Sequence, residues 1–141
     1  MINKPFIGIA GNIGVGKTTM TEKLCEELNW NPIFESVIDN PYLEDFYSNM
    51  SRWSFNLQVY FLHNRLSNQI KLMKDGNSFI QDRTIYEDRE IFALNLYKNG
   101  SMSKRDWDTY NNLFNYMSSF VPEPALIIYL QANTDTLMSR I

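Results

Sequence analysis

The chain has few of the features that mark secreted and membrane-spanning proteins. It has one cysteine among 141 residues, so no disulfide can form within it, which favours a reducing, cytoplasmic setting. Its apolar runs are short: Ala125–Leu130 is among the longest, far below the roughly 20 residues that a membrane-spanning helix needs. No basic segment leads into a long apolar one, so no secretion signal is visible. We therefore expect no membrane partner.

Basic residues are not concentrated anywhere either. Lys and Arg number 13 against 16 Asp and Glu, for a formal net charge of −3. Without a basic stripe the sequence predicts no groove for nucleic acid. The hydrophobic fraction of 44% is that of a globular protein, and the length suits a single domain over residues 1–141.

A complete phosphate-binding pattern stands near the N-terminus. Residues 11–18 read GNIGVGKT, which matches G-x-x-x-x-G-K-[ST]. The apolar run Phe6–Ala10 before it predicts a buried strand, and the segment Lys17–Leu28 has helical apolar spacing. The pattern predicts binding of a nucleoside triphosphate through Gly11, Asn12, Ile13, Gly14, Val15, Gly16, Lys17, Thr18 and Thr19.

The chemistry of this loop explains its residue types. Glycines allow the backbone to fold so that several N–H groups converge on phosphate, at the positive end of the following helix. Lys17 is expected to reach the outer phosphates, and the Thr18 hydroxyl to hold Mg²⁺.

Strands and helices alternate along the rest of the chain. Further strands are predicted at 33–35, 79–81 and 125–130, the last as a fully buried parallel strand. Helices are predicted near 42–47, 52–74 and 86–98, then from the Ser103 cap to about 117, and from about 134 onward. This order predicts an α/β fold of the P-loop NTPase type, a doubly wound parallel sheet with helices on both faces.

The chain stops a few residues into its last helix, with no terminating signal. P-loop kinases usually close over the nucleotide with an arginine-bearing lid, and no sequence remains here to build one. We expect a chain truncated at its C-terminus.

Candidate catalytic groups follow two of the predicted strands. Asp82 and Arg83 come directly after the strand 79–81, where a carboxylate would point into the ligand-binding crevice of a parallel sheet. They would supply a second Mg²⁺ ligand, besides Thr18, and a cation for the transferring phosphoryl group. Glu35, at the end of the predicted strand 33–35, could accept a proton from a substrate hydroxyl.

The long helix 52–74 has a second constellation. Gln58 and Arg65 lie seven residues apart and share a face, and a glutamine amide can pair with a base edge. The alternative for these two is a solvated surface. His63 is interpreted as a surface or packing residue, and Cys25 as a small core hydrophobe.

Four segments together resemble the deoxyribonucleoside kinases, most closely their bacterial deoxyadenosine/deoxycytidine kinase branch. They are GNIGVGKTT, Glu35 with the NPYLEDFY that follows it, RWSFNLQVYFLHNR and QDRTIYEDREIFA. The resemblance covers essentially the whole chain. It implies that Glu35 contacts the 5′-hydroxyl as base, that Asp82 binds Mg²⁺ or itself takes the proton, and that Arg83 stabilises the migrating phosphoryl group.

The resemblance also implies a nucleoside site. Tyr47 would bind the sugar 3′-hydroxyl, Gln58 the base edge, and Phe92 would stack on the base. Arg65 and Asp88 match a pair that lines the base pocket in members accepting cytosine and purines.

These roles imply ATP-dependent phosphorylation of the 5′-hydroxyl of deoxyadenosine, deoxycytidine or both, in nucleotide salvage, with Mg²⁺ and a homodimeric enzyme. One alternative is a nucleoside monophosphate kinase of the thymidylate kinase type. Another is a GTPase switch or nucleotide-gated binding module, against which the absence of an Asn-Lys-x-Asp guanine reader counts. A third is a fragment that binds nucleotide without turnover. The sequence does not rank the nucleosides.

Overall fold

The computed structural model describes residues 5–12, 14–34 and 40–140, which belong to two compact units. The sheet unit contains the described residues up to 34 together with 69–84 and 123–140. The helical unit contains 40–68 and 85–122. The single domain over residues 1–141 stays a prediction.

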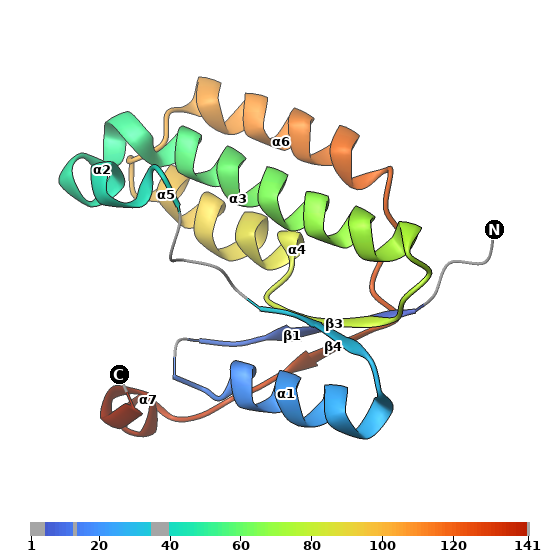
Figure 1. The fold of residues 1–141 in the computed structure, drawn as a ribbon. Coiled ribbons are helices and arrows are strands. Elements are labelled where there is room, and N and C mark those ends of the chain that lie inside the picture. The colour runs from blue at the N-terminus through green and yellow to red at the C-terminus, as the bar shows by residue number, and fades with distance from the viewer. Residues whose placement is uncertain (1–4, 13, 35–39, 141) are drawn as a thin grey trace. The chain divides into compact units, whose positions relative to one another are not determined.

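Four parallel strands form the sheet (Figure 1). They are β1 (Phe6–Ala10), β2 (Asn31–Ile33), β3 (Phe79–Asp82) and β4 (Leu126–Tyr129), in the order β2-β3-β1-β4. Each pairing is parallel, with Phe6 opposite Phe79 and Ile9 opposite both Asp82 and Ile128. The predicted parallel sheet is confirmed.

Helices cover both faces of this sheet. Side chains alternate between the faces of a strand, so Ile9 and Ile80 share one face while Phe6 and Phe79 share the other. The helix α1 (Lys17–Leu28) packs Cys25 against the first face. The second face is covered by Leu72 and Met73, at the end of the helix α3 (Met50–Lys74), against Phe6, Ile33 and Phe79.

Cys25 is the core hydrophobe that the sequence predicts. It is 8% exposed and contacts the cluster of Ile9 and Ile80. Burial raises the pKa of its thiol, against a smaller opposite effect of the backbone of Ile80. A neutral, buried thiol is a poor nucleophile.

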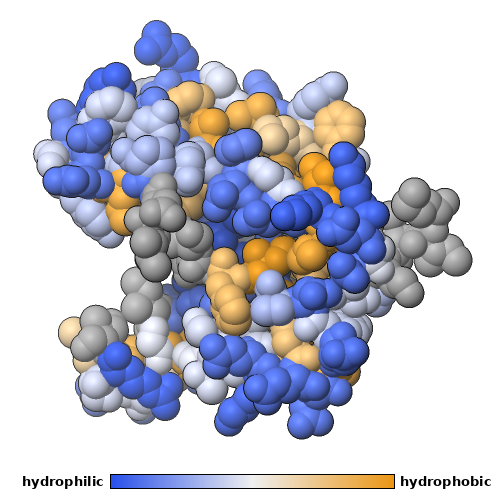
Figure 2. Space-filling view, viewed as in Figure 1, coloured by the Kyte–Doolittle hydropathy of each residue, from blue (hydrophilic) through white to orange (hydrophobic). Residues whose placement is uncertain are grey.

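Two strands differ from the prediction. The second lies at 31–33, whereas the sequence predicts 33–35; Phe34 is outside the strand, and Glu35 is outside the described residues. Pro32 can be part of the strand because β2 is an edge strand, where a missing N–H is tolerated. The expectation that 125–130 is fully buried is wrong. Leu126 and Ile127 are 53% and 49% exposed, because β4 is the other edge. Figure 2 shows apolar side chains reaching the surface among hydrophilic ones.

The helical unit has α2 (Leu43–Ser48), most of α3, and α6 (Lys104–Ser118). A continuous helical run precedes α6 in the chain. That run consists of α4 (Ile85–Glu87), the π-helical segment η1 (Asp88–Ala93) and α5 (Leu94–Lys98). Its core contains Phe46, Leu57, Leu96 and Met102, with Trp107 packed against them. The Ser103 hydroxyl accepts a hydrogen bond from the Asp106 N–H at 3.1 Å, so the predicted cap of α6 is confirmed.

The last helix, α7 (Thr134–Arg140), belongs to the sheet unit. In the described part of the chain, no helix combines the length and apolar character that crossing a membrane requires.

Candidate active site

The backbone of the loop between β1 and α1 depends on its glycines. Gly11 has φ of +149°, and a Cβ there would lie 2.8 Å from both the Leu130 carbonyl oxygen and Val15 Cγ1. Gly16 has φ of +108° at the first turn of α1, a conformation that costs glycine little. The Lys17 ammonium donates to the Asn12 carbonyl at 3.2 Å, across the loop. The side chain of Lys17 thus lies across the described part of the loop.

Asp82 meets this loop from the end of β3. The Thr18 hydroxyl donates to Asp82 Oδ2 at 2.9 Å, and Asp82 is 2% exposed. The strand register explains the contact, because Asp82 lies opposite Ile9 on the face of the sheet that α1 covers. A hydroxyl and a carboxylate that are 64 residues apart in sequence are thereby joined at the start of α1.

These two groups fit a magnesium ion. Magnesium is usually held by one or two protein oxygens together with substrate phosphates, not by a cage of protein ligands. Within residues 5–12, 14–34 and 40–140, no cluster of three or more His, Cys, Asp or Glu side chains suits a metal. Thr18 and Asp82 thus have the chemistry and the position to hold Mg²⁺ beside bound phosphate.

Arg83 turns back from the strand end to the loop. Its φ of +76° lies in the left-handed region, which costs a non-glycine residue about 1–3 kcal/mol. Its N–H donates to the Ile9 carbonyl at 2.9 Å, and its Nη2 to the Gly11 carbonyl at 3.3 Å. The strained turn brings the guanidinium of Arg83, a residue that is 2% exposed, onto the loop.

Arg140, which sequence reasoning missed, also contacts the loop. From the end of α7, its Nη1 donates to the carbonyls of Gly14 and Val15 at 3.3 and 3.4 Å. Arg140 is more than 120 positions from Gly14 and Val15 in the sequence, so no local sequence pattern predicts the contact. It brings a second cationic side chain to the loop.

The helical unit contains the residues predicted to recognise a nucleoside. Gln58 and Arg65 are 3% and 5% exposed, so they belong to the buried face of α3 and the solvated alternative is wrong. Gln58 Oε1 has no hydrogen-bond partner in the described part of the chain. A buried acceptor costs about 1–3 kcal/mol when unpaired, so this atom favours a ligand donor. His63 is exposed, as predicted.

Arg65 and Asp88 form a buried ion pair. The Arg65 Nε donates to Asp88 Oδ2, and Nη2 donates to Oδ1 at 3.3 Å, so the carboxylate is held by a two-pronged contact. Asp88 is 2% exposed. The pair joins α3 to the first residue of η1, and single-turn π-helical insertions are frequent at functional sites.

The two aromatic candidates are more open. Phe92, on η1, is 37% exposed and lines a hollow with Ile91, Leu94 and Lys98. Tyr47 is 70% exposed, and its ring contacts Phe46 with 5.5 Å between centroids. The structure thus joins Arg65 with Asp88 but does not bring Tyr47 into that buried group.

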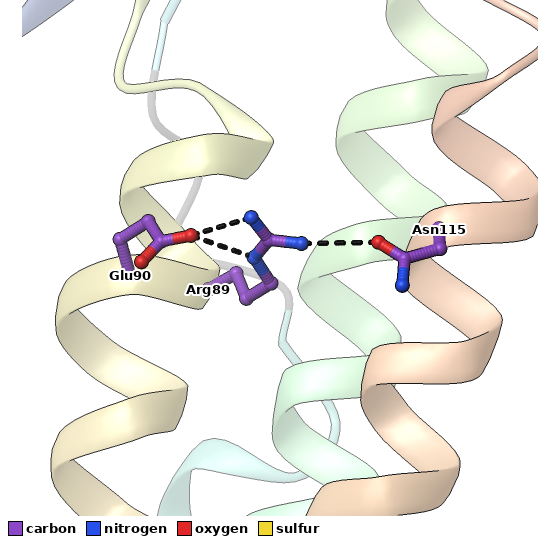
Figure 3. Close-up of polar contacts among 3 residues, drawn as sticks. All are labelled: Arg89, Glu90 and Asn115. Atoms are coloured by element: carbon purple, nitrogen blue, oxygen red, sulfur yellow. Dashed lines mark hydrogen bonds and ion pairs between the residues drawn. The ribbon is translucent and has the colours of Figure 1, made fainter.

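Arg89 anchors η1 to α6 (Figure 3). Its Nη1 donates to the Asn115 side-chain oxygen at 3.1 Å, and its Nε to Glu90 Oε1 at 2.9 Å. The guanidinium also lies over the Phe114 ring, 4.2 Å from its centroid. Because Arg89 follows Asp88 in the chain, these contacts hold the turn that presents Asp88.

Two candidates fall outside the described residues. They are Glu35, the predicted base, and Ile13 in the phosphate loop. Their predicted roles stay predictions.

Comparison with known proteins identifies a family. A family model described as deoxynucleoside kinase matches residues 7–141. The chain is 44% identical over 138 residues to the deoxyadenosine/deoxycytidine kinase of Bacillus subtilis, covering 96% of this chain and 64% of that protein. It is 42% identical over 135 residues to the deoxyadenosine kinase of Dictyostelium discoideum, covering 96% and 55%.

A solved structure is similar as well. The deoxyadenosine kinase of M. mycoides with bound dATP aligns with a TM-score of 0.78 at 32% identity, covering 97% of this chain and 69% of that one. The chain spans 64% and 55% of the length of the two curated relatives.

Proposed function

We propose that this chain, which belongs to the deoxynucleoside kinase family, acts in the transfer of the γ-phosphoryl group of ATP to the 5′-hydroxyl of a deoxyribonucleoside. Deoxyadenosine and deoxycytidine are the proposed acceptors. The observation that carries this proposal is the contact of Asp82 with Thr18 at the phosphate loop, next to Arg83. Together, these residues provide a phosphate-binding loop, a carboxylate and a buried cation, which are the groups that phosphoryl transfer uses.

The donor half is the phosphate loop. The loop backbone and Lys17 would bind the ATP phosphates, and Thr18 and Asp82 would hold Mg²⁺, which neutralises phosphate charge when bound. Arg83 would stabilise the charge that develops on the oxygens of the transferring group. The bond from the 5′-oxygen to phosphorus forms as the bond to the β–γ bridging oxygen breaks, and ADP leaves.

The acceptor half is the buried face of α3 with η1. Gln58 would pair with the base edge through its amide, and the Arg65–Asp88 pair would line the pocket around the base. Phe92 would stack on the base, and Tyr47 would bind the 3′-hydroxyl. An uncharged nucleoside suits this half better than a monophosphate, which would need further arginines.

The proton of the 5′-hydroxyl goes to Glu35 or to Asp82. Replacing the base, as Glu35→Gln or Asp82→Asn, should lower kcat by roughly 10²–10⁴. If Glu35→Gln keeps wild-type turnover, the role belongs to Asp82.

The acceptor assay separates this function from its rival. We expect radiolabel from the γ-phosphate of ATP to appear on deoxyadenosine, in a reaction that needs Mg²⁺. Transfer to deoxyadenosine monophosphate instead would establish a nucleoside monophosphate kinase. Nucleotide binding without transfer to either acceptor would contradict the kinase proposal for this chain. Homodimer formation is also proposed, to be checked by light scattering, together with a cytoplasmic location and the absence of a nucleic-acid partner.

A further inference from the structure

Arg140, at the end of α7, is a cation to which the proposed function gives no part. Arg140 and the phosphate loop belong to the same compact unit, the sheet unit. Its Nη1 donates to the carbonyls of Gly14 and Val15, which are two successive peptide groups of the loop. The guanidinium therefore acts on the loop backbone itself.

The peptide group between Gly14 and Val15 is held from both sides. Its carbonyl accepts from Arg140, and its N–H donates to the Asn12 carbonyl at 3.2 Å. The C=O and N–H of a trans peptide point in opposite directions, so the two contacts together fix the orientation of its plane. The Asn12 carbonyl also accepts from the Lys17 ammonium. Arg140 is thus connected to Lys17 through one peptide group and one carbonyl.

The next peptide group, between Val15 and Gly16, is held on its carbonyl side. Because that carbonyl accepts from Arg140, the Gly16 N–H points away from the guanidinium. The backbone N–H groups at such a helix start are those that bind phosphate. With φ of +82° and +108°, Gly14 and Gly16 flank peptide groups that rotate at little cost. A contact that stops this rotation spares the ligand the cost of ordering the loop.

The segment that carries Arg140 also lies against the start of the loop. The Leu130 N–H donates to the Ala10 carbonyl at 2.9 Å, and a Cβ on Gly11 would lie 2.8 Å from the Leu130 carbonyl oxygen. The Asn133 side-chain oxygen accepts from the Thr136 N–H at 2.7 Å at the first turn of α7. The segment 130–140 therefore has its own anchors, and these hold Arg140 beside the loop.

We propose that Arg140 is a positioning residue of the phosphate site, whose guanidinium holds the two peptide groups around Val15 in the orientation that binds phosphate before the nucleotide arrives. It acts through the loop backbone and not by touching the nucleotide. This inference rests on the proposed binding of ATP at this loop.

Arg140→Met tests the inference, because it keeps a long side chain and removes the guanidinium. We expect the affinities for Mg-ATP and for Mg-tripolyphosphate to fall by the same factor, about tenfold, since both ligands use the loop and the loss is that of a hydrogen bond to a charged group. Calorimetric titration measures both. In steady-state kinetics KM for ATP should rise by that factor, with KM for deoxyadenosine and kcat unchanged.

Amide hydrogen exchange in the nucleotide-free chain separates a positioning role from two others. We expect Arg140→Met to make exchange of the Val15 N–H faster, while that of Cys25, within α1, stays the same. If Arg140 only contacted bound phosphate, exchange without nucleotide would not change. If it only anchored α7, exchange would become faster at Leu137, whose N–H donates to the Asn133 carbonyl, but not at Val15.

Lys23→Met is the matched control. Lys23 is an exposed cation on α1, in the same compact unit as the loop, so the change removes one positive charge without removing the contact with Gly14 and Val15. Both affinities and the exchange of Val15 should stay as in the wild type.

Four results would overturn the inference alone. They are unchanged affinities in Arg140→Met, a loss for Mg-ATP without one for Mg-tripolyphosphate, a loss of both without faster exchange at Val15, and an equal loss in Lys23→Met. In each of them the wild-type chain binds Mg-ATP, so the proposed function stands. A wild-type chain that binds Mg-ATP but transfers nothing would overturn the proposed function alone, and one that does not bind Mg-ATP would overturn both.

Discussion

The contact between Asp82 and Thr18 depends on the register of one strand pair. Asp82 lies opposite Ile9 in the β1–β3 pairing, so its side chain emerges on the α1 face, where the Thr18 hydroxyl contacts it. A slip of one residue would turn the carboxylate to the other face. The parallel pairing therefore places the carboxylate, and the glycine-rich loop places the hydroxyl.

Replacing Asp82 by asparagine tests this arrangement. The amide oxygen can still accept the Thr18 hydrogen bond, so the fold should be kept while the charge is lost. We expect kcat to fall at least about 10²-fold and the Mg²⁺ concentration for half-maximal rate to rise. Steady-state kinetics over a MgCl₂ series measures both. Asp75→Asn, in the exposed turn after α3, is the control, and unchanged kinetics in Asp82→Asn would refute the assignment.

Gln58 presents a conflict between stability and binding. Its Oε1 is buried without a partner in the described chain, so Gln58→Leu should leave the melting temperature unchanged or raise it. The same change should weaken deoxynucleoside binding by roughly 10–100-fold, because a base edge loses its amide partner. Calorimetric titration and thermal unfolding give the two values.

Gln69 is the matched control for that experiment. It lies on the same helix, is 2% exposed, and has an Nε2 without a partner in the part of the chain that the structure describes. Gln69→Leu should resemble Gln58→Leu in stability but keep nucleoside affinity. Equal losses of affinity in both variants would contradict the role of Gln58.

At the scale of elements, β1 depends on a close approach. A Cβ on Gly8 would lie 2.5 Å from the Thr84 methyl carbon. Gly8→Ala should therefore destabilise the fold by about 1–3 kcal/mol, the usual effect of overpacking. Urea unfolding measures the loss. Adding Thr84→Ser, which removes that methyl group and keeps the hydroxyl, should restore most of it; no recovery would show that the contact is not the cause.

The elements also show what could be predicted from sequence. Helical apolar spacing predicts α1, α3 and α6 well, since each helix is long enough for its apolar residues to repeat over several turns. The short strand β2 was misplaced because Pro32 resembles a helix breaker and only the sheet order reveals an edge. For the same reason the apolar run of β4 predicted burial that the edge position does not provide.

The site residues also differ in how well the sequence predicts them. Asp82, Arg83 and the loop follow from local motifs and strand ends. Whether Gln58 and Arg65 face solvent or the interior could not be read from spacing, because it depends on what packs on α3. Arg140 could not be found at all, since its contacts join distant segments.

At the scale of the whole molecule, each compact unit has one half of the proposed reaction. The sheet unit holds the phosphate loop with Asp82 and Arg83, and the helical unit holds Gln58 with the Arg65–Asp88 pair. Membership of the deoxynucleoside kinase family explains both halves in one chain. The proposed function thus requires that ATP and a deoxynucleoside bind together.

The central claim is that an uncharged deoxynucleoside accepts the phosphoryl group. The most direct test is a kcat/KM panel with ATP and Mg²⁺ over the four deoxynucleosides and deoxyadenosine monophosphate. We expect the highest values for deoxyadenosine or deoxycytidine, with thymidine far lower and the monophosphate inert. A preference for thymidine would contradict the base pocket at Arg65 and Asp88, and a preference for the monophosphate would contradict the proposed function itself.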